Sequence, residues 1–134
     1  MIAKTTRATI ETPIPTLGLD LDGVISENPL VFAILSEVWP GRVVIITYRD
    51  DRAKTEADLS RYAIRYDELI LVDSFDAKAQ VISQQMGVSI YIDDQPEMLK
   101  DVPQSVAVML FRNPGNFDHD DKKWTFSDRT GKLI

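Results

Sequence analysis

Short apolar runs recur along the chain, and stretches with a helical period separate them. Five of these runs are rich in Val and Ile and nearly continuous: TLGLDL (16–21), RVVIITY (42–48), ELILVD (68–73), SIYID (89–93) and SVAVMLF (105–111). Runs of this kind are typical of strands that are buried on both faces of a parallel sheet. The pattern therefore predicts five strands joined by helices.

Start and stop signals predict where the helices lie. The first begins with Asn28 as its N-cap, followed by a proline at the first helical position. A second is expected over roughly 50–66, a third from a cap near Asp76, and a short fourth from Pro96. One face of the first helix carries the apolar residues expected to pack on the sheet: Val31, Ile34, Leu35 and Val38.

Strands that alternate with helices indicate an open, Rossmann-like α/β fold with helices on both faces of a parallel sheet. With 134 residues, the chain is interpreted as one domain over 1–134. Residues 1–15 are either a frayed tail or an added edge strand. Residues 112–134 are interpreted as a loop-rich tail anchored by Trp124 and Phe126.

Charge and composition narrow the classes of function. The net charge is −6, which argues against strong non-specific binding to nucleic acid and against an anionic membrane surface. The chain has no cysteine, so thiolate metal sites are excluded. No apolar run approaches the length of a membrane span, and the N-terminus lacks the core of a signal peptide. The default expectation is a cytoplasmic protein.

Polar residues follow the predicted strands at the point where each one ends. In open α/β sheets, ligands bind outside these carboxyl ends, so side chains from separate segments are expected to meet at one edge. The residues concerned are Asp20 and Asp22 at the end of the first strand, Thr47 and Arg49 at the end of the second, Lys78 in the helix after the third, and Asp93 and Asp94 at the end of the fourth.

These residue types together indicate phosphoryl-transfer chemistry. Several carboxylates in one place favour a hard cation such as Mg²⁺. One carboxylate can attack phosphorus, and a second can act as general acid and base. Thr47 and Lys78 can stabilise the phosphoryl oxygens. Arg49 is either a surface ion-pair partner or a contact of the substrate phosphate, and His119 is interpreted as a solvated loop residue.

The same motifs resemble the haloacid dehalogenase superfamily of phosphatases. The matching stretches are LGLDLDGV, VVIITY, DAKAQV and IYIDDQP, in that order along residues 17–96. The resemblance implies a sheet of strand order 5-4-1-2-3, with Asp20 as nucleophile and Asp22 as general acid/base. It also implies Mg²⁺ bound by Asp20, by the backbone carbonyl of Asp22 and by the Asp93/Asp94 pair, with Asp94 the more direct ligand of that pair. Thr47, Arg49, Lys78 and Gly23 are the expected substrate contacts.

Spacing between the motifs leaves no room for a cap domain. Capless members of this superfamily tend to act on large substrates or to complete their site with a neighbouring subunit, so a homo-oligomer is one expectation. The stretches ITYRDD and IDDQPE are most similar to the 5′-nucleotidase and polynucleotide 3′-phosphatase branches. The substrate is thus expected to be a phosphorylated small molecule or a macromolecular end. A weakly active or non-catalytic binding module is the alternative, and a phosphorylated receiver domain ranks last.

Overall fold

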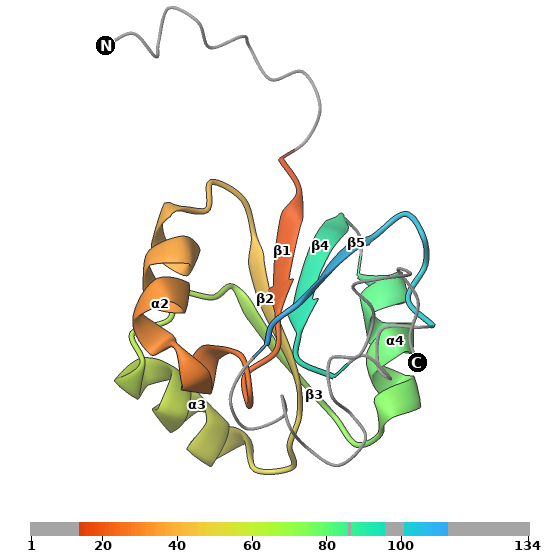
Figure 1. Cartoon of the computed structure of the whole chain (residues 1–134). Helices are drawn as coiled ribbons and strands as arrows, with labels where there is room; N and C mark the ends of the chain where they lie inside the picture. The colour runs from red at the N-terminus through yellow and green to blue at the C-terminus, as the bar shows by residue number, and fades with distance from the viewer. Residues whose placement is uncertain (1–13, 86, 96–100, 113–134) are drawn as a thin grey trace, which may run out of the picture.

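The computed structural model describes residues 14–85, 87–95 and 101–112 of the chain. Strands and helices alternate along it (Figure 1). The elements are β1 (Thr16–Leu19), the short 3-10 helix η1 (Ile25–Glu27), α2 (Pro29–Val38), β2 (Val43–Tyr48), α3 (Arg52–Arg61), β3 (Glu68–Val72), α4 (Phe75–Gln84), β4 (Val88–Asp93) and β5 (Ala107–Leu110). Each of the five apolar runs thus contains a strand. The helix expected at Pro96, residues 1–13 and the tail from 113, with His119, lie outside the described residues.

The strands form a single five-stranded sheet in which every neighbouring pair is parallel. The observed order is β3-β2-β1-β4-β5, which from the opposite edge reads 5-4-1-2-3. β1 lies in the middle, and its Leu19 is in register with Ile45 of β2 on one side and Ile92 of β4 on the other. The ends of β1 and β4 therefore lie side by side, although they are distant in sequence.

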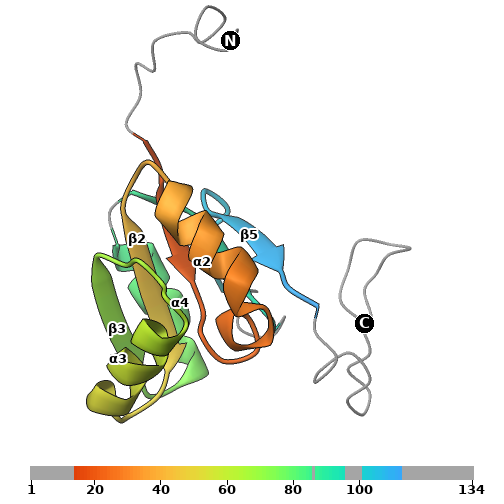
Figure 2. The same cartoon turned by 90° about the vertical axis from the view of Figure 1, so that its left-hand side faces the viewer.

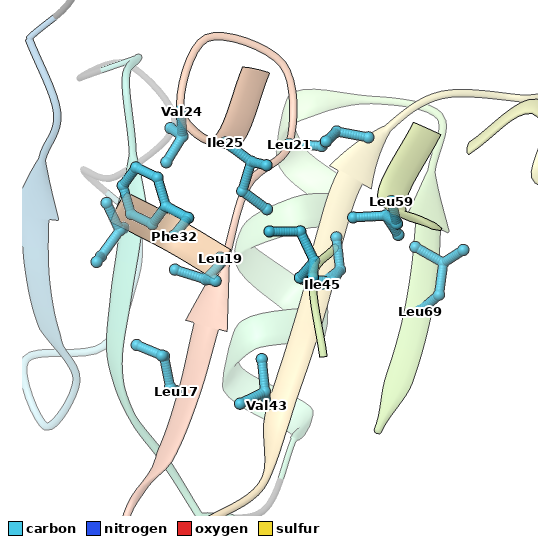
Figure 3. Close-up of a cluster of buried hydrophobic side chains, with 12 residues drawn as sticks. Leu17, Leu19, Leu21, Val24, Ile25, Phe32, Val43, Ile45, Leu59 and Leu69 are labelled. Atoms are coloured by element: carbon cyan, nitrogen blue, oxygen red, sulfur yellow. The ribbon is translucent and has the colours of Figure 1, made fainter. Parts of the chain in front are cut away.

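Helices cover both faces of the sheet and bury a core on each (Figures 1 and 2). α2 and α3 lie over one face, where β1 and β2 contribute alternate residues such as Leu17, Leu19 and Ile45 (Figure 3). On the other face, Ile46 and Tyr91 belong to a core that includes Ile82 of α4. Among the described residues, no helix has the length and apolar character needed to cross a membrane.

No cap domain is inserted in the stretch 14–85. There, η1 and α2 join β1 to β2, α3 joins β2 to β3, and α4 follows β3. The edge of the sheet at which the strands end is therefore not covered by any inserted unit within that stretch.

α2 turns a different face to the sheet from the one expected. Val31, Ile34 and Val38 are 49%, 56% and 66% exposed, whereas Phe32 and Ser36 are buried. The prediction was wrong for these three because α2 is apolar almost all round, so its periodicity did not select one face. Ser36 is satisfied in the interior, since its hydroxyl donates to the Ala33 carbonyl and accepts from the backbone N–H of Arg65.

The start of α4 also differs from the expectation. Its N-cap is Ser74, whose hydroxyl accepts the backbone N–H of Ala77 at 3.1 Å, and Asp76 lies in the first turn. Ser and Asp are both good N-caps, so the residue types alone do not decide which of the two occupies the cap position. This start places Lys78 one turn into the helix, on the side that faces the sheet.

Candidate active site

Three aspartates converge where β1 and β4 end. Asp20 follows β1 directly, Asp93 is the last residue of β4, and Asp94 comes next. One carboxylate oxygen from each lies within 4.8 Å of those of the others, and all three residues are buried. The parallel pairing of β1 with β4 brings them together, as the sequence predicted.

Lys78 reaches this acid cluster from α4. Its Nζ lies 2.9 Å from Oδ1 of Asp20 and 2.8 Å from Oδ2 of Asp93, and the side chain is 1% exposed. A buried lysine needs such partners because its ammonium loses hydration. Lys78 thus contacts two of the three carboxylates of the cluster.

Tyr91 is a member of the site that sequence reasoning missed. Its hydroxyl lies 2.9 Å from Oδ2 of Asp93 and 3.1 Å from the carbonyl oxygen of Ile46. The hydroxyl has one proton, which these two acceptors share. Its ring packs on Gly18, where an added Cβ would lie 2.8 Å from the ring. A glycine inside an apolar strand was the available signal, because it marks a close approach by another group.

Gly23 allows the loop after β1 to pass against the cluster. Its φ is +86°, a conformation that residues with a side chain rarely adopt, and an added Cβ would overlap the Asp94 carboxylate. Its backbone N–H donates to Oγ of Ser26 at 3.0 Å. The expected substrate contact of Gly23 stays a prediction; in the structure, its lack of a side chain leaves room for Asp94.

Burial sets the charge balance of the cluster. It raises the pKa of Asp20 to about 8; the Lys78 ammonium opposes that rise, while the neighbouring Asp93 and Asp94 charges add to it. Burial pulls the pKa of Lys78 down, but Asp20 and Asp93 more than offset this and hold it above its ordinary value. Burial also raises the pKa of Tyr91, with contributions from the same carboxylates. Without a metal, burial thus favours the neutral form of Asp20, while Lys78 keeps its charge.

Thr47 lies at the end of β2 and is 1% exposed. Its Oγ1 has no hydrogen-bond partner within the described part of the chain. A buried hydroxyl in this condition is unusual because its desolvation is not compensated. It is a polar atom in need of a partner, at the edge of the sheet where the acid cluster lies.

Asp22 stands apart from the three converging acids. Its side chain is 55% exposed, and Arg49 donates to both of its oxygens at 2.8 Å. Arg49 also contacts Asp58 of α3 at 2.8 Å, and Arg61 and Arg49 hold the pKa of Asp58 well below its usual range. Of the two roles expected for Arg49, the structure thus displays the ion pair.

The acid cluster fits a hard divalent cation. Its donors are carboxylate oxygens, which Mg²⁺ prefers, and one oxygen of each aspartate is close enough to those of the others to share one ion. The two acids of the β4 end are not equivalent. Asp93 accepts hydrogen bonds at both of its oxygens, from Lys78 and Tyr91 at one and from the backbone N–H of Gln95 at the other.

Comparisons of the chain with protein-family models, with curated proteins and with solved structures found no match. The resemblance seen in the motifs thus stays a sequence-based interpretation.

Proposed function

We propose that this protein is a Mg²⁺-dependent phosphatase of the haloacid dehalogenase type, which hydrolyses a phosphomonoester through an aspartyl-phosphate on Asp20. The observation that carries the proposal is the buried cluster of Asp20, Asp93 and Asp94 with Lys78. The unpartnered hydroxyl of Thr47 adds support, since a phosphoryl oxygen would supply the hydrogen bond that it lacks.

Asp20 and Asp94 are the side chains that would hold Mg²⁺, together with the backbone carbonyl of Asp22. Asp93 is the less direct of the pair, because its oxygens already accept hydrogen bonds from three protein groups. Its role is to orient Lys78. When bound, Mg²⁺ supplies positive charge that offsets the carboxylates and the phosphoryl oxygens.

In the first half of the reaction, a carboxylate oxygen of Asp20 bonds to phosphorus while the bond from phosphorus to the ester oxygen breaks. The departing oxygen takes a proton from Asp22. In the second half, Asp22 takes a proton from water, and the water oxygen bonds to phosphorus. The acyl-phosphate bond then breaks, which restores the Asp20 carboxylate and releases phosphate.

Asp22 can exchange protons with a substrate only after Arg49 gives up at least one of its oxygens, since Arg49 donates to both. A substrate phosphate is itself a bidentate acceptor for a guanidinium. We therefore assign Arg49 two alternating partners, Asp22 in the resting protein and the phosphate in the complex. Asp58 keeps the guanidinium at the site in both states.

Phosphate release from 4-nitrophenyl phosphate tests the proposal. Release should require Mg²⁺, and Asp20→Asn should lower its rate by at least about a thousandfold. That variant removes a buried carboxylate and should fold, so the loss would not reflect unfolding. Glu56→Gln on the exposed side of α3 is the matched control and should retain the rate. Absence of Mg²⁺-dependent release across a broad panel of phosphomonoesters would overturn the proposal.

Asp22→Asn separates general-acid catalysis from the rest of the reaction. A nitrophenolate leaves readily without a proton, whereas an alkoxide does not. The variant should therefore lose much more activity toward an alkyl phosphate than toward 4-nitrophenyl phosphate. Equal losses of activity toward both substrates would show that Asp22 is not the general acid.

The Asp22–Arg49 pair also favours a second candidate function, a weakly active or non-catalytic module that acts through a partner. If the pair does not open, the proposed acid is withheld from any substrate. Calorimetry would then detect Mg²⁺ binding that Asp94→Asn abolishes, without hydrolysis of any phosphomonoester. Partner binding in that case should persist in Asp20→Asn.

A further inference from the structure

A shallow hollow of about 290 Å³ lies at the edge of the sheet where β2 and β3 end. It is lined by Tyr48, Asp73, Ser74 and Asp76. These residues come from the end of β2, the loop after β3 and the first turn of α4. Figure 1 shows these three segments meeting at the lower edge of the sheet, where the strands end.

The hollow lies on the same face of the sheet as the acid cluster. Ile46 belongs to the core on the α4 face, and Tyr48 is two residues further along β2, so strand alternation gives it the same side. Tyr48 is in register with Val72, which precedes Asp73. The Ile46 carbonyl accepts from Tyr91, whose hydroxyl also contacts Asp93, so the same strand borders both regions.

α4 connects the hollow to Lys78. Ser74 and Asp76 line the hollow, and Lys78 follows within the same turn with its Nζ on Asp20. A phosphoryl group on Asp20 would thus leave the rest of its substrate room to extend across β2 toward Asp73. A volume of about 290 Å³ is at the lower limit for a ligand pocket and suits a small group.

The walls of the hollow carry negative charge and an aromatic ring. Asp73 and Asp76 are exposed, and within the described part of the chain neither carboxylate has a hydrogen-bond or ion-pair partner. Tyr48, which is 54% exposed, also lines the hollow and contributes an aromatic ring. Carboxylates beside an aromatic face attract an ammonium group and repel an anion.

We propose that this hollow binds the cationic end of a small phosphomonoester, such as a phosphorylated amino alcohol, whose phosphate lies at Asp20 and Lys78. The inference rests on the proposed function and specifies its substrate class. A substrate with further phosphates, such as a polynucleotide end, would bring like charges close to Asp73 and Asp76. The acidic hollow thus selects one positive charge beside one phosphate.

Three phosphates of similar size test the preference in the chain of residues 1–134 with Mg²⁺. They are phosphocholine, 3,3-dimethylbutyl phosphate, in which a carbon replaces the charged nitrogen, and 2-carboxyethyl phosphate. The value of kcat/KM should fall about tenfold from the first to the second, and further for the third. Comparable values for phosphocholine and the carboxylated compound would overturn the inference.

Variants of the hollow supply the internal control. The double variant Asp73→Asn/Asp76→Asn should reduce the preference for phosphocholine over its neutral isostere to about twofold or less. Glu37→Gln, an exposed acid at the end of α2 on the opposite face, should leave the preference unchanged. A preference that persists in the double variant would reject the hollow as its origin.

Choline chloride distinguishes failure of this inference from failure of the proposed function. In an NMR titration of Asp20→Asn, choline should shift the amide signals of Tyr48, Ser74 and Asp76. If the variant shows such shifts and the wild-type protein hydrolyses no phosphate, the cation site is retained and the phosphatase is rejected. Hydrolysis without shifts or charge preference would retain the phosphatase and reject the cation site.

Discussion

At the scale of single residues, Gly23 and Gly87 form a natural comparison. Both have a positive φ, +86° and +85°. An added Cβ at Gly87 would meet only Oγ1 of Thr16 at an ordinary 3.4 Å, whereas at Gly23 it would overlap the Asp94 carboxylate. Both positions therefore require a positive φ, but only at Gly23 does the site also need the space that a side chain would fill.

We expect Gly87→Ala to lower the free energy of unfolding by about 1 kcal/mol through backbone strain alone. Gly23→Ala should cost about 1–3 kcal/mol more because of the overlap, and should also weaken Mg²⁺ binding by displacing Asp94. Urea unfolding and calorimetric titration with Mg²⁺ measure the two effects. Equal losses of stability and an unchanged Mg²⁺ affinity in both variants would contradict this account of Gly23.

At the scale of elements, Arg65 joins the end of α2 to the loop before β3. Its guanidinium donates to the carbonyls of Ser36, Trp39 and Gly41 at 2.8, 3.0 and 3.1 Å. The last carbonyls of a helix lack partners within the helix, and a basic side chain satisfies them well. Arg65 thus fixes where α2 ends and β2 begins.

Arg65→Met should lower the free energy of unfolding by about 1–3 kcal/mol, because three carbonyls lose a charged donor. Lys54→Met on the exposed side of α3 is the control, and its ion pair with Asp58 is expected to contribute less than about 1 kcal/mol. Urea unfolding at neutral pH compares them. Similar losses in the two variants would show that the cap does not stabilise the protein.

Element boundaries and helix faces reveal where sequence reasoning succeeded. Strands were predicted well because continuous β-branched runs have few alternative structures. The face of α2 was not, because Val31 and Ile34 are as apolar as the residues that pack. Phe32 is buried instead and packs on Phe111 with the two rings 5.4 Å apart, a contact between residues distant in sequence.

At the scale of the whole molecule, the buried acids govern how stability depends on pH. The pKa of Asp20 is raised from 3.8 to about 8 by burial in the folded, metal-free protein. Between these values the unfolded chain releases a proton that the folded chain retains. Raising the pH across this interval therefore favours unfolding. The lowered pKa of Asp58 acts only at more acidic pH.

The melting temperature in EDTA should thus fall as the pH rises from about 4 toward about 8, and Asp20→Asn should flatten this dependence. Added Mg²⁺ should raise the melting temperature most at the upper end of the interval, where it binds the ionised carboxylate. Thermal scans over the pH series check both effects. Parallel curves for the wild type and the variant would mean that Asp20 is not the controlling group.

The sequence alone determined that acids from the ends of β1 and β4 belong together with Lys78, because strand pattern, parallel topology and residue type each pointed to one edge. Only the tertiary structure decided what each residue contacts. Arg49 turned to Asp22 and Asp58, and Tyr91 reached Asp93 past Gly18. These pairings join segments far apart in the chain and depend on side-chain directions, which no local pattern encodes.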